Sequence, residues 1–236
     1  MRRQVMARWN VADVMTIGAI SVQEDTPFKE IVDLLEAHEI NAVPVVDGFD
    51  RVVGVVSSAD LVPKIEFAGV DDRLRVFEAR HTRQARGKAH ATAAGELMNA
   101  PAITVMSTTS LVAAARIMET ETLKRLPVVD DAGRLIGMVT RRDLLKVFLR
   151  TDAEIRGEIL AEALDGLVGV DPSQLRVEVD DGVVTLLGEV DRGSLVPSLV
   201  RQIERVDGVV DVVSHLSFDI DESGEQQKGF QAPVMF

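Results

Sequence analysis

The apolar positions of the first 150 residues fall into short runs that alternate with amphipathic stretches. Residues 42–46 and 52–56 are β-branched and almost continuously apolar, which is typical of strands covered on both faces. A shorter strand is predicted at residues 20–22. Between it and these runs, Ile31, Leu34, Leu35 and His38 recur at spacings of three and four, which predicts a helix with these residues on its inner face. The pattern reads strand, helix, strand, strand, helix.

The same pattern returns at an offset of 83 residues without a gap. The segment Gly54-x-x-Ser57-x-x-Asp60 returns as Gly137-x-x-Thr140-x-x-Asp143, residues 43–47 return as 126–130, and Val14-Met15 returns as Leu97-Met98. The chain therefore holds two copies of one supersecondary unit, and a ligand that fits the first copy is a candidate for the second.

Cap and turn residues separate these elements. Thr26 and Pro27 predict an N-cap and a first-turn proline for the first helix. In the second copy, Thr109 or Ser110 predicts the cap of a helix whose inner face is Val112, Ala115, Ile117 and Met118. Residues 47–50 and their counterparts 130–133 predict hairpin turns.

The pattern changes after Thr151. Residues 155, 159, 163 and 167 mark an amphipathic helix, residues 175–179 and 183–188 predict strands around the turn Asp181-Gly182, and a helix at about 192–205 precedes a last strand near 209–212. The order is α-β-β-α-β. Residues 222–236 are expected to form a loose tail.

The two copies resemble cystathionine-β-synthase (CBS) domains, over roughly residues 10–62 and 93–147, and the third part resembles a BON domain over residues 151–221. The resemblance implies an α/β (α+β) fold, with two β-α-β-β-α CBS units in a pseudo-twofold pair and a small α-β-β-α-β BON domain. Residues 1–9 form an N-terminal segment and residues 63–92 a basic linker.

Charge and composition narrow the function. Residues 151–222 hold 17 acidic residues and 5 arginines, which accounts for the whole net charge of −12. Nucleic acid is therefore not an expected partner. The chain has no cysteine and only four histidines, which excludes thiolate chemistry and disfavours a metal site. No Ser-His-Asp set or glycine-rich phosphate loop stands out, and no enzyme activity is expected. Without an apolar run of eighteen residues, a cytoplasmic location is expected.

The CBS resemblance implies two sites for an adenine nucleotide (AMP, ADP or ATP), with S-adenosylmethionine as a further possibility and magnesium only alongside ATP. Asp60 and Asp143 would accept hydrogen bonds from ribose hydroxyls, because a carboxylate offers two acceptor oxygens to two neighbouring donors. Ser57 and Thr140 would face the ribose or phosphate. The adenine would lie against a set of strand residues, namely Ile20, Val43, Pro44, Ile103, Leu126 and Pro127.

The two sites differ in charge. Five cations lie beside the second motif, namely Lys124, Arg125, Arg134, Arg141 and Arg142, where the first copy has Asn41, Ala42, Arg51, Ser58 and Ala59. We therefore expect the phosphorylated ligand at the second motif and a weaker, empty or adenosine-like first site. The alternative needs no ligand, because Ser57 with Asp60 and Thr140 with Asp143 also fit capping boxes.

Between the copies, the stretch from Arg73 to Lys88 is basic, with Glu78 as its one acid. It is interpreted as a solvated linker, or alternatively as an arm that faces phosphate or a partner.

The hypothesis for the whole chain is a non-enzymatic sensor that binds an adenine nucleotide and signals through its acidic BON domain. It is expected to be a homodimer through its CBS helices, with a protein partner at the BON domain. The alternatives are a ligand-free structural dimerisation module and a membrane adaptor, although acidity disfavours anionic bilayers.

Overall fold

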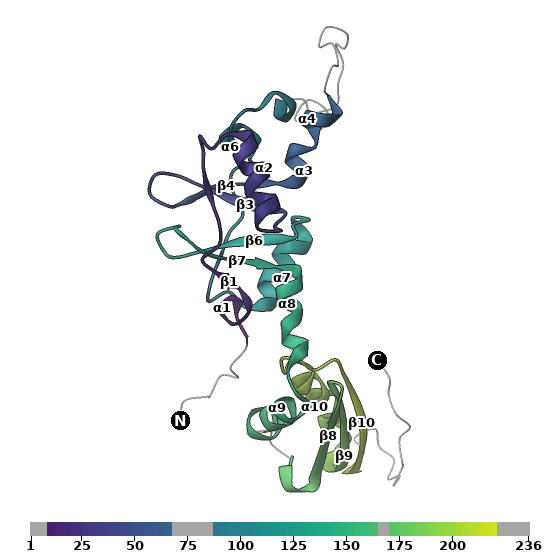
Figure 1. Cartoon of the computed structure of the whole chain (residues 1–236). Coiled ribbons are helices and arrows are strands. Elements are labelled where there is room, and N and C mark those ends of the chain that lie inside the picture. Colours follow the sequence, from purple (N-terminus) through teal and green to yellow (C-terminus); the bar gives the residue numbers. More distant parts are fainter. Residues whose placement is uncertain (1–8, 68–86, 165–169, 221–236) are drawn as a thin grey trace. The chain divides into compact units, whose positions relative to one another are not determined.

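The structure is a computed structural model that describes residues 9–67, 87–164 and 170–220. These residues form two compact units, one from residues 10–144 and the other from residue 9 together with residues from 145 onward (Figure 1). Several predicted features lie outside the described residues: the segment 1–8, the arginines at positions 73–86, position 167 and the tail.

Each copy in the first unit has the predicted order of elements. The first contains β2 (Val22–Gln23), α2 (Phe28–Ala37), β3 (Ala42–Val46), β4 (Val52–Ser57), α3 (Ser58–Leu61) and α4 (Pro63–Glu66); the second contains β5 (Val105–Met106), α7 (Leu111–Thr120), β6 (Arg125–Val129), β7 (Leu135–Thr140) and α8 (Arg141–Leu144). In both sheets the first strand runs parallel to the second, which pairs antiparallel with the third. The predicted α/β (α+β) class is confirmed.

The opening segment of each copy pairs with the other copy. In the chain, α1 (Val11–Val14) and β1 (Thr16–Ile17) precede the first copy, yet Thr16 lies opposite Met138 in β7. Likewise α6 (Ala94–Leu97) precedes the second copy, but its buried side chains join the core of the first, and Asn99 bridges to Val55 in β4. Sequence neighbours are therefore not spatial neighbours at these two points.

This exchange explains the glycine of the repeated motif. A Cβ atom on Gly54 would lie 2.3 Å from the Met98 sulfur, and one on Gly137 would lie 2.5 Å from the Thr16 carbonyl oxygen. In each copy the opening segment crosses the strand directly above the glycine. Only a residue without a side chain allows so close an approach.

The two hairpin turns of the copies are built alike and bond to each other. In each, one aspartate oxygen accepts from two turn N–H groups and the other from an arginine Nε, in the pairs Asp47–Arg51 and Asp130–Arg134. The Val52 N–H donates to the Gly133 carbonyl at 3.1 Å, and the turns lie side by side (Figure 1). The copies thus form a pseudo-twofold pair.

Three predicted helix details are wrong. His38 was predicted on the inner face of the first helix, but it follows the end of α2 and is exposed. The first helix begins at Phe28 after Pro27, because the Thr26 hydroxyl instead accepts from the Gln23 N–H. The second is capped by Ser110 as predicted, but its buried face is Leu111, Ala114 and Met118, whereas Val112 and Ala115 are exposed. The three-and-four spacing begins one residue earlier than predicted, directly after the cap.

The second unit confirms the predicted α-β-β-α-β order. It contains α9 (Asp152–Glu158), which continues as a π-helical turn (Ile159–Ala163), then β8 (Leu175–Asp180), β9 (Val183–Arg192), α10 (Val196–Ile203) and β10 (Asp211–Ile220). Short 3-10 turns lie at Leu145–Leu149, Pro172–Gln174 and Gly193–Leu195. The sheet order is β10-β9-β8, with β9 and β10 parallel. Helices and sheet enclose one apolar core.

The predicted turn between β8 and β9 is held from the helix. Asp181 and Gly182 both adopt a positive φ, at 48° and 77°, as a tight hairpin turn requires. Their N–H groups donate to the Asp152 carboxylate at 3.1 and 2.9 Å. Thr151 in turn caps α9 with Glu154 in a capping box. The start of the helix therefore fixes the position of the turn.

Candidate functional site

The predicted pair Ser57 and Asp60 lies where β4 ends and α3 begins. The Ser57 N–H and hydroxyl both donate to Asp60 Oδ2, at 2.7 and 2.6 Å. This is the reciprocal hydrogen bond of a capping box, so the capping role considered for the pair is present in the structure. One oxygen of the carboxylate serves the helix, and the other is directed elsewhere.

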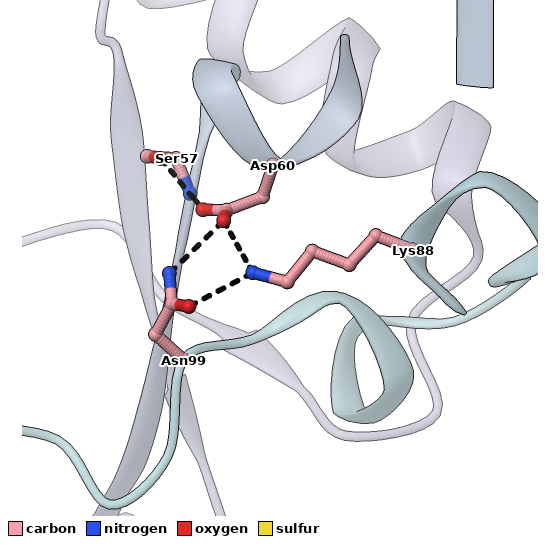
Figure 2. A network of polar contacts seen from close by, with 4 residues as sticks. All are labelled: Ser57, Asp60, Lys88 and Asn99. Carbon is pink, nitrogen blue, oxygen red and sulfur yellow. Dashed lines mark hydrogen bonds and ion pairs between the residues drawn. The ribbon is translucent and has the colours of Figure 1, made fainter. Parts of the chain in front are cut away.

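The other Asp60 oxygen faces Lys88 and Asn99 (Figure 2). The Lys88 ammonium forms an ion pair with Oδ1 and donates to the Asn99 side-chain oxygen at 2.8 Å, while Asn99 Nδ2 donates to Oδ1 at 3.0 Å. Asp60 and Lys88 are each only 8% exposed. The three side chains close a triangle in which each contacts the other two.

This triangle uses the full acceptor capacity of Asp60. The carboxylate accepts two hydrogen bonds on each oxygen, and a carboxylate offers about four lone-pair positions. Burial alone would raise its pKa, but the hydrogen bonds from Lys88 and Ser57 outweigh burial and hold the pKa of Asp60 below its ordinary value. Asp60 is therefore a charged and fully bonded group.

The segment that carries Lys88 is anchored a second time. Lys64, in α4, donates to the carbonyls of Ala91 at 2.7 Å and Ala89 at 3.3 Å, and its ammonium lies 4.7 Å from the centre of the Phe28 ring. Lys88 was part of the basic stretch interpreted as a solvated linker. For this residue that interpretation is wrong, because an ion pair draws its ammonium into the first copy.

In the second copy, Thr140 and Asp143 repeat the capping geometry. The Thr140 N–H and hydroxyl donate to Asp143 Oδ2 at 2.9 and 2.6 Å, and the Asp143 N–H returns a bond of 3.3 Å. Asp143 is partly exposed, in contrast to Asp60. At the repeat offset, Val5 and Thr16 stand in place of Lys88 and Asn99. The second copy thus lacks the sequence for the same triangle.

The five predicted cations have different surroundings. Arg141 bonds the carbonyls of Leu123 at 2.9 Å and Met118 at 3.0 Å, so it holds the end of α7. Arg134 is paired with its turn aspartate, and Lys124 and Arg142 are exposed. Arg125 is half-buried.

Arg125 has the most unusual environment of these cations. Burial lowers the pKa of its guanidinium. Within the described ranges, no carboxylate or carbonyl forms a hydrogen bond or ion pair with it. It lies directly opposite Thr140 across β6 and β7, and residues opposite each other in an antiparallel pair direct their side chains to the same face.

The apolar residues predicted to contact adenine are divided between core and surface. Val43, Pro44, Leu126 and Pro127 are buried in β3 and β6. Ile20 packs against the first core, and Ile103 is 37% exposed. Since Val43 and Leu126 are completely enclosed, their positions offer backbone groups rather than side chains to a ligand.

Sequence reasoning missed the roles of Lys88 and Asn99. The available signal was the repeat itself: Asn99 directly follows Leu97-Met98, and Lys88 precedes that segment where the first copy has a valine. In the part of the chain that the structure describes, no helix has the length and apolar character to cross a bilayer. The same residues contain no cluster of three or more acidic or histidine side chains suited to a metal.

The fold and these sites define a class: a protein with a CBS pair followed by a small BON domain. Comparison with known families agrees, because the CBS domain model matches residues 11–66 and 94–150 and the BON domain model matches residues 151–219. The chain belongs to the CBS-domain family and carries a BON domain behind the pair.

Relatives share the CBS region. CBSX1, a chloroplastic CBS domain-containing protein of Arabidopsis thaliana, is 30% identical over 140 residues, which are 55% of this chain and 58% of that protein. The homoserine O-acetyltransferase of Methanocorpusculum labreanum is 32% identical over 60% of this chain but only 24% of the enzyme. The chain therefore spans between a quarter and somewhat over half of these relatives, and the match assigns it no enzyme activity.

A solved structure extends the comparison. The crystal structure of CBSX2 in complex with AMP has a TM-score of 0.52 and 30% identity, and the match covers 60% of this chain and 97% of that one. CBSX2 is an Arabidopsis thaliana protein. The CBS pair of CBSX2 therefore binds AMP.

Proposed function

We propose that this protein is a non-enzymatic regulator that binds an adenine nucleotide at its second CBS copy and reports occupancy through its BON domain. The half-buried guanidinium of Arg125, beside Thr140 and without an anionic partner among the described residues, carries the proposal. The AMP complex of CBSX2 supports the choice of ligand class.

Arg125 suits a phosphate because it lacks a counter-charge. A cation withdrawn from water without an anion is destabilised, and an anion that binds beside it removes that penalty. Guanidinium also matches phosphate oxygens in a bidentate geometry. The phosphate would bind Arg125, while the Thr140–Asp143 turn on the same face would meet the ribose. In the first copy this position is Ala42, which offers no charge.

The BON domain is proposed to bind a protein rather than a membrane. Residues 151–222 carry 17 acidic residues against 5 arginines, and a surface of that sign is repelled by anionic lipid. A partner with a basic surface fits this charge. The CBS helices are proposed to form a homodimer, which light scattering of the intact chain would test.

Calorimetric titration of the intact chain tests the nucleotide site. We expect AMP, ADP or ATP to bind and Arg125→Met to weaken binding by about 10- to 150-fold, since one charge-assisted hydrogen bond contributes about 1.5–3 kcal/mol. Adenosine, which has no phosphate, should lose little. Arg116→Met is the matched control, because Arg116 is an exposed arginine on α7.

Other outcomes would assign a different role. Unchanged AMP affinity in Arg125→Met contradicts the phosphate contact. Equal loss of AMP and adenosine binding would indicate a folding defect or a purely apolar site. If neither the nucleotides nor S-adenosylmethionine bind, the pair is a structural module, as in the alternative hypothesis.

A further inference from the structure

We propose that Lys88 is an internal occupant of the first nucleotide site and excludes the ribose of a ligand from Asp60. The first CBS copy is therefore closed by the chain itself, and one chain binds one nucleotide. The inference rests on the proposed function for its second half, because the single nucleotide is the one bound at the second copy.

The closure follows from the bonding of Asp60. Ribose hydroxyls would need acceptor positions on this carboxylate, and all are taken by Ser57, Lys88 and Asn99 (Figure 2). In the first copy Oδ2 serves the start of α3, and Oδ1 is the oxygen that faces Lys88 and Asn99. There an ammonium and an amide stand where two ligand hydroxyls would donate.

A ribose cannot easily displace this lysine. Two neutral hydroxyls can replace hydrogen bonds to Asp60, but they bring no positive charge to a carboxylate that is 8% exposed. The expelled ammonium would also lose Asn99. Breaking a buried ion pair leaves uncompensated charge, so the exchange is unfavourable for a ligand that is neutral at its ribose.

The anchoring of the connector reinforces the closure. Lys64 holds the carbonyls of Ala89 and Ala91, one and three residues beyond Lys88. The backbone just after Lys88 is therefore held in place by hydrogen bonds from Lys64. The position of Lys88 beside Asp60 does not depend on the ion pair alone.

The repeat does not reproduce Lys88 in the second copy. Each site is completed by the opening segment that crosses from the other copy, which supplies Asn99 at the first site and Thr16 at the second. Six residues before α6 stands Lys88, and six residues before α1 stands Val5. The sequence of the second copy offers no ammonium at the corresponding position.

A rescue experiment with AMP as the probe tests the inference in the intact chain. Asp143→Asn disables the second site, and Lys88→Ala is then added to open the first. We expect wild type to bind one AMP, Asp143→Asn to bind at least tenfold more weakly, and the Asp143→Asn/Lys88→Ala variant to regain binding. Adding Asp60→Asn should abolish the regained binding.

The matched control is Asp143→Asn/Lys64→Ala, which loosens the same connector but leaves the Lys88–Asp60 ion pair in place. It should not regain binding. Two equal AMP sites in wild type would overturn the inference, as would a folded Asp143→Asn/Lys88→Ala variant that fails to regain binding. If wild type binds no AMP but Lys88→Ala does, the closure stands and the proposed function of the second copy fails.

Amine labelling gives a readout that does not depend on nucleotide. Acetylation of the folded protein, followed by peptide mass spectrometry, should modify Lys88 at least tenfold more slowly than the exposed Lys124. Asp60→Asn should remove that protection, whereas saturating AMP should leave it intact. Equal rates at Lys88 and Lys124 in wild type would show that the ammonium is free in solution and would overturn the inference.

Discussion

Replacing Lys88 by methionine should destabilise the CBS pair without changing the BON unit. Methionine keeps the length of the side chain but removes the ammonium, which leaves Asp60 charged and buried with three of its four hydrogen bonds. Both side chains of the ion pair are only 10% exposed, so solvent screens the pair weakly.

The size of the effect follows from the class of interaction. Removing one partner of a buried ion pair costs about 3–5 kcal/mol, and the three hydrogen bonds retained by Asp60 favour the lower end, about 3 kcal/mol. For a unit of this size that is a fall of about 10 °C in Tm. An exposed control, Lys124→Met, should change the free energy of unfolding by less than about 0.5 kcal/mol.

The chain offers separate probes for its two units. Its single tryptophan, Trp9, belongs to the BON unit, where the Trp9 backbone N–H donates to the Asp207 carboxylate at 2.6 Å. Urea unfolding followed by far-UV circular dichroism should show the loss, while the tryptophan fluorescence transition should stay in place. A shift of the fluorescence transition by the same amount would show that the units unfold together.

A double-mutant cycle tests the cause. Lys88→Met/Asp60→Asn removes both charges, so it should be more stable than the sum of the two single losses predicts. The penalty of Lys88→Met should also shrink at acid pH, because the unpaired carboxylate then takes up a proton. A loss below about 1 kcal/mol, or strict additivity in the cycle, would refute the account of Asp60 as a buried charge that depends on Lys88.

Three further outcomes follow. The pKa of Asp60 is lowered on folding. Its contribution to the free energy of unfolding is therefore complete above the unfolded pKa, near 3.9, and is lost as pH falls through the folded pKa. In Asp60→Asn the free energy of unfolding should fall less steeply with pH below about pH 4. Gly137→Ala should cost about 1–3 kcal/mol in urea unfolding, since its Cβ would meet the Thr16 carbonyl, whereas Gly48→Ala, with nothing within 4 Å, should cost little. Gly188→Ala, at φ 127° and 2.1 Å from the Gln174 carbonyl, should destabilise the tryptophan-reported transition by a similar amount, and unaltered fluorescence would contradict this.

Much of the fold was predictable because the repeat doubles every local signal. The apolar runs at residues 42–46 and 126–129, the hairpin aspartates and the capping residues each occur twice at one offset. The BON order followed from periodicity and one turn. The inner face of α7 was misassigned because alanines at positions 113–115 give the periodicity little contrast.

The candidate site was harder to predict because it depends on long-range contacts. The exchange of opening segments leaves no signal in the local sequence, since the hydrophobic pattern of these residues is compatible with pairing to either copy. Lys88 belonged to a basic stretch, and charge alone cannot distinguish a solvated cation from one drawn into a buried carboxylate. Arg141 was counted with the phosphate-binding cations, but its contacts with the end of α7 depend on how the helix ends.

The crossed opening segments change what counts as one domain of this protein. If the chain were cut between its copies, the N-terminal fragment would carry α1 and β1, which complete the second sheet, and the C-terminal fragment would carry α6, which completes the first core. Neither fragment would contain a whole folding unit, but the pair would. Deletions at the N-terminal end of α1 would thus destabilise the second copy, which is distant in the sequence. If their effects were assigned by sequence position, they would be attributed to the wrong copy.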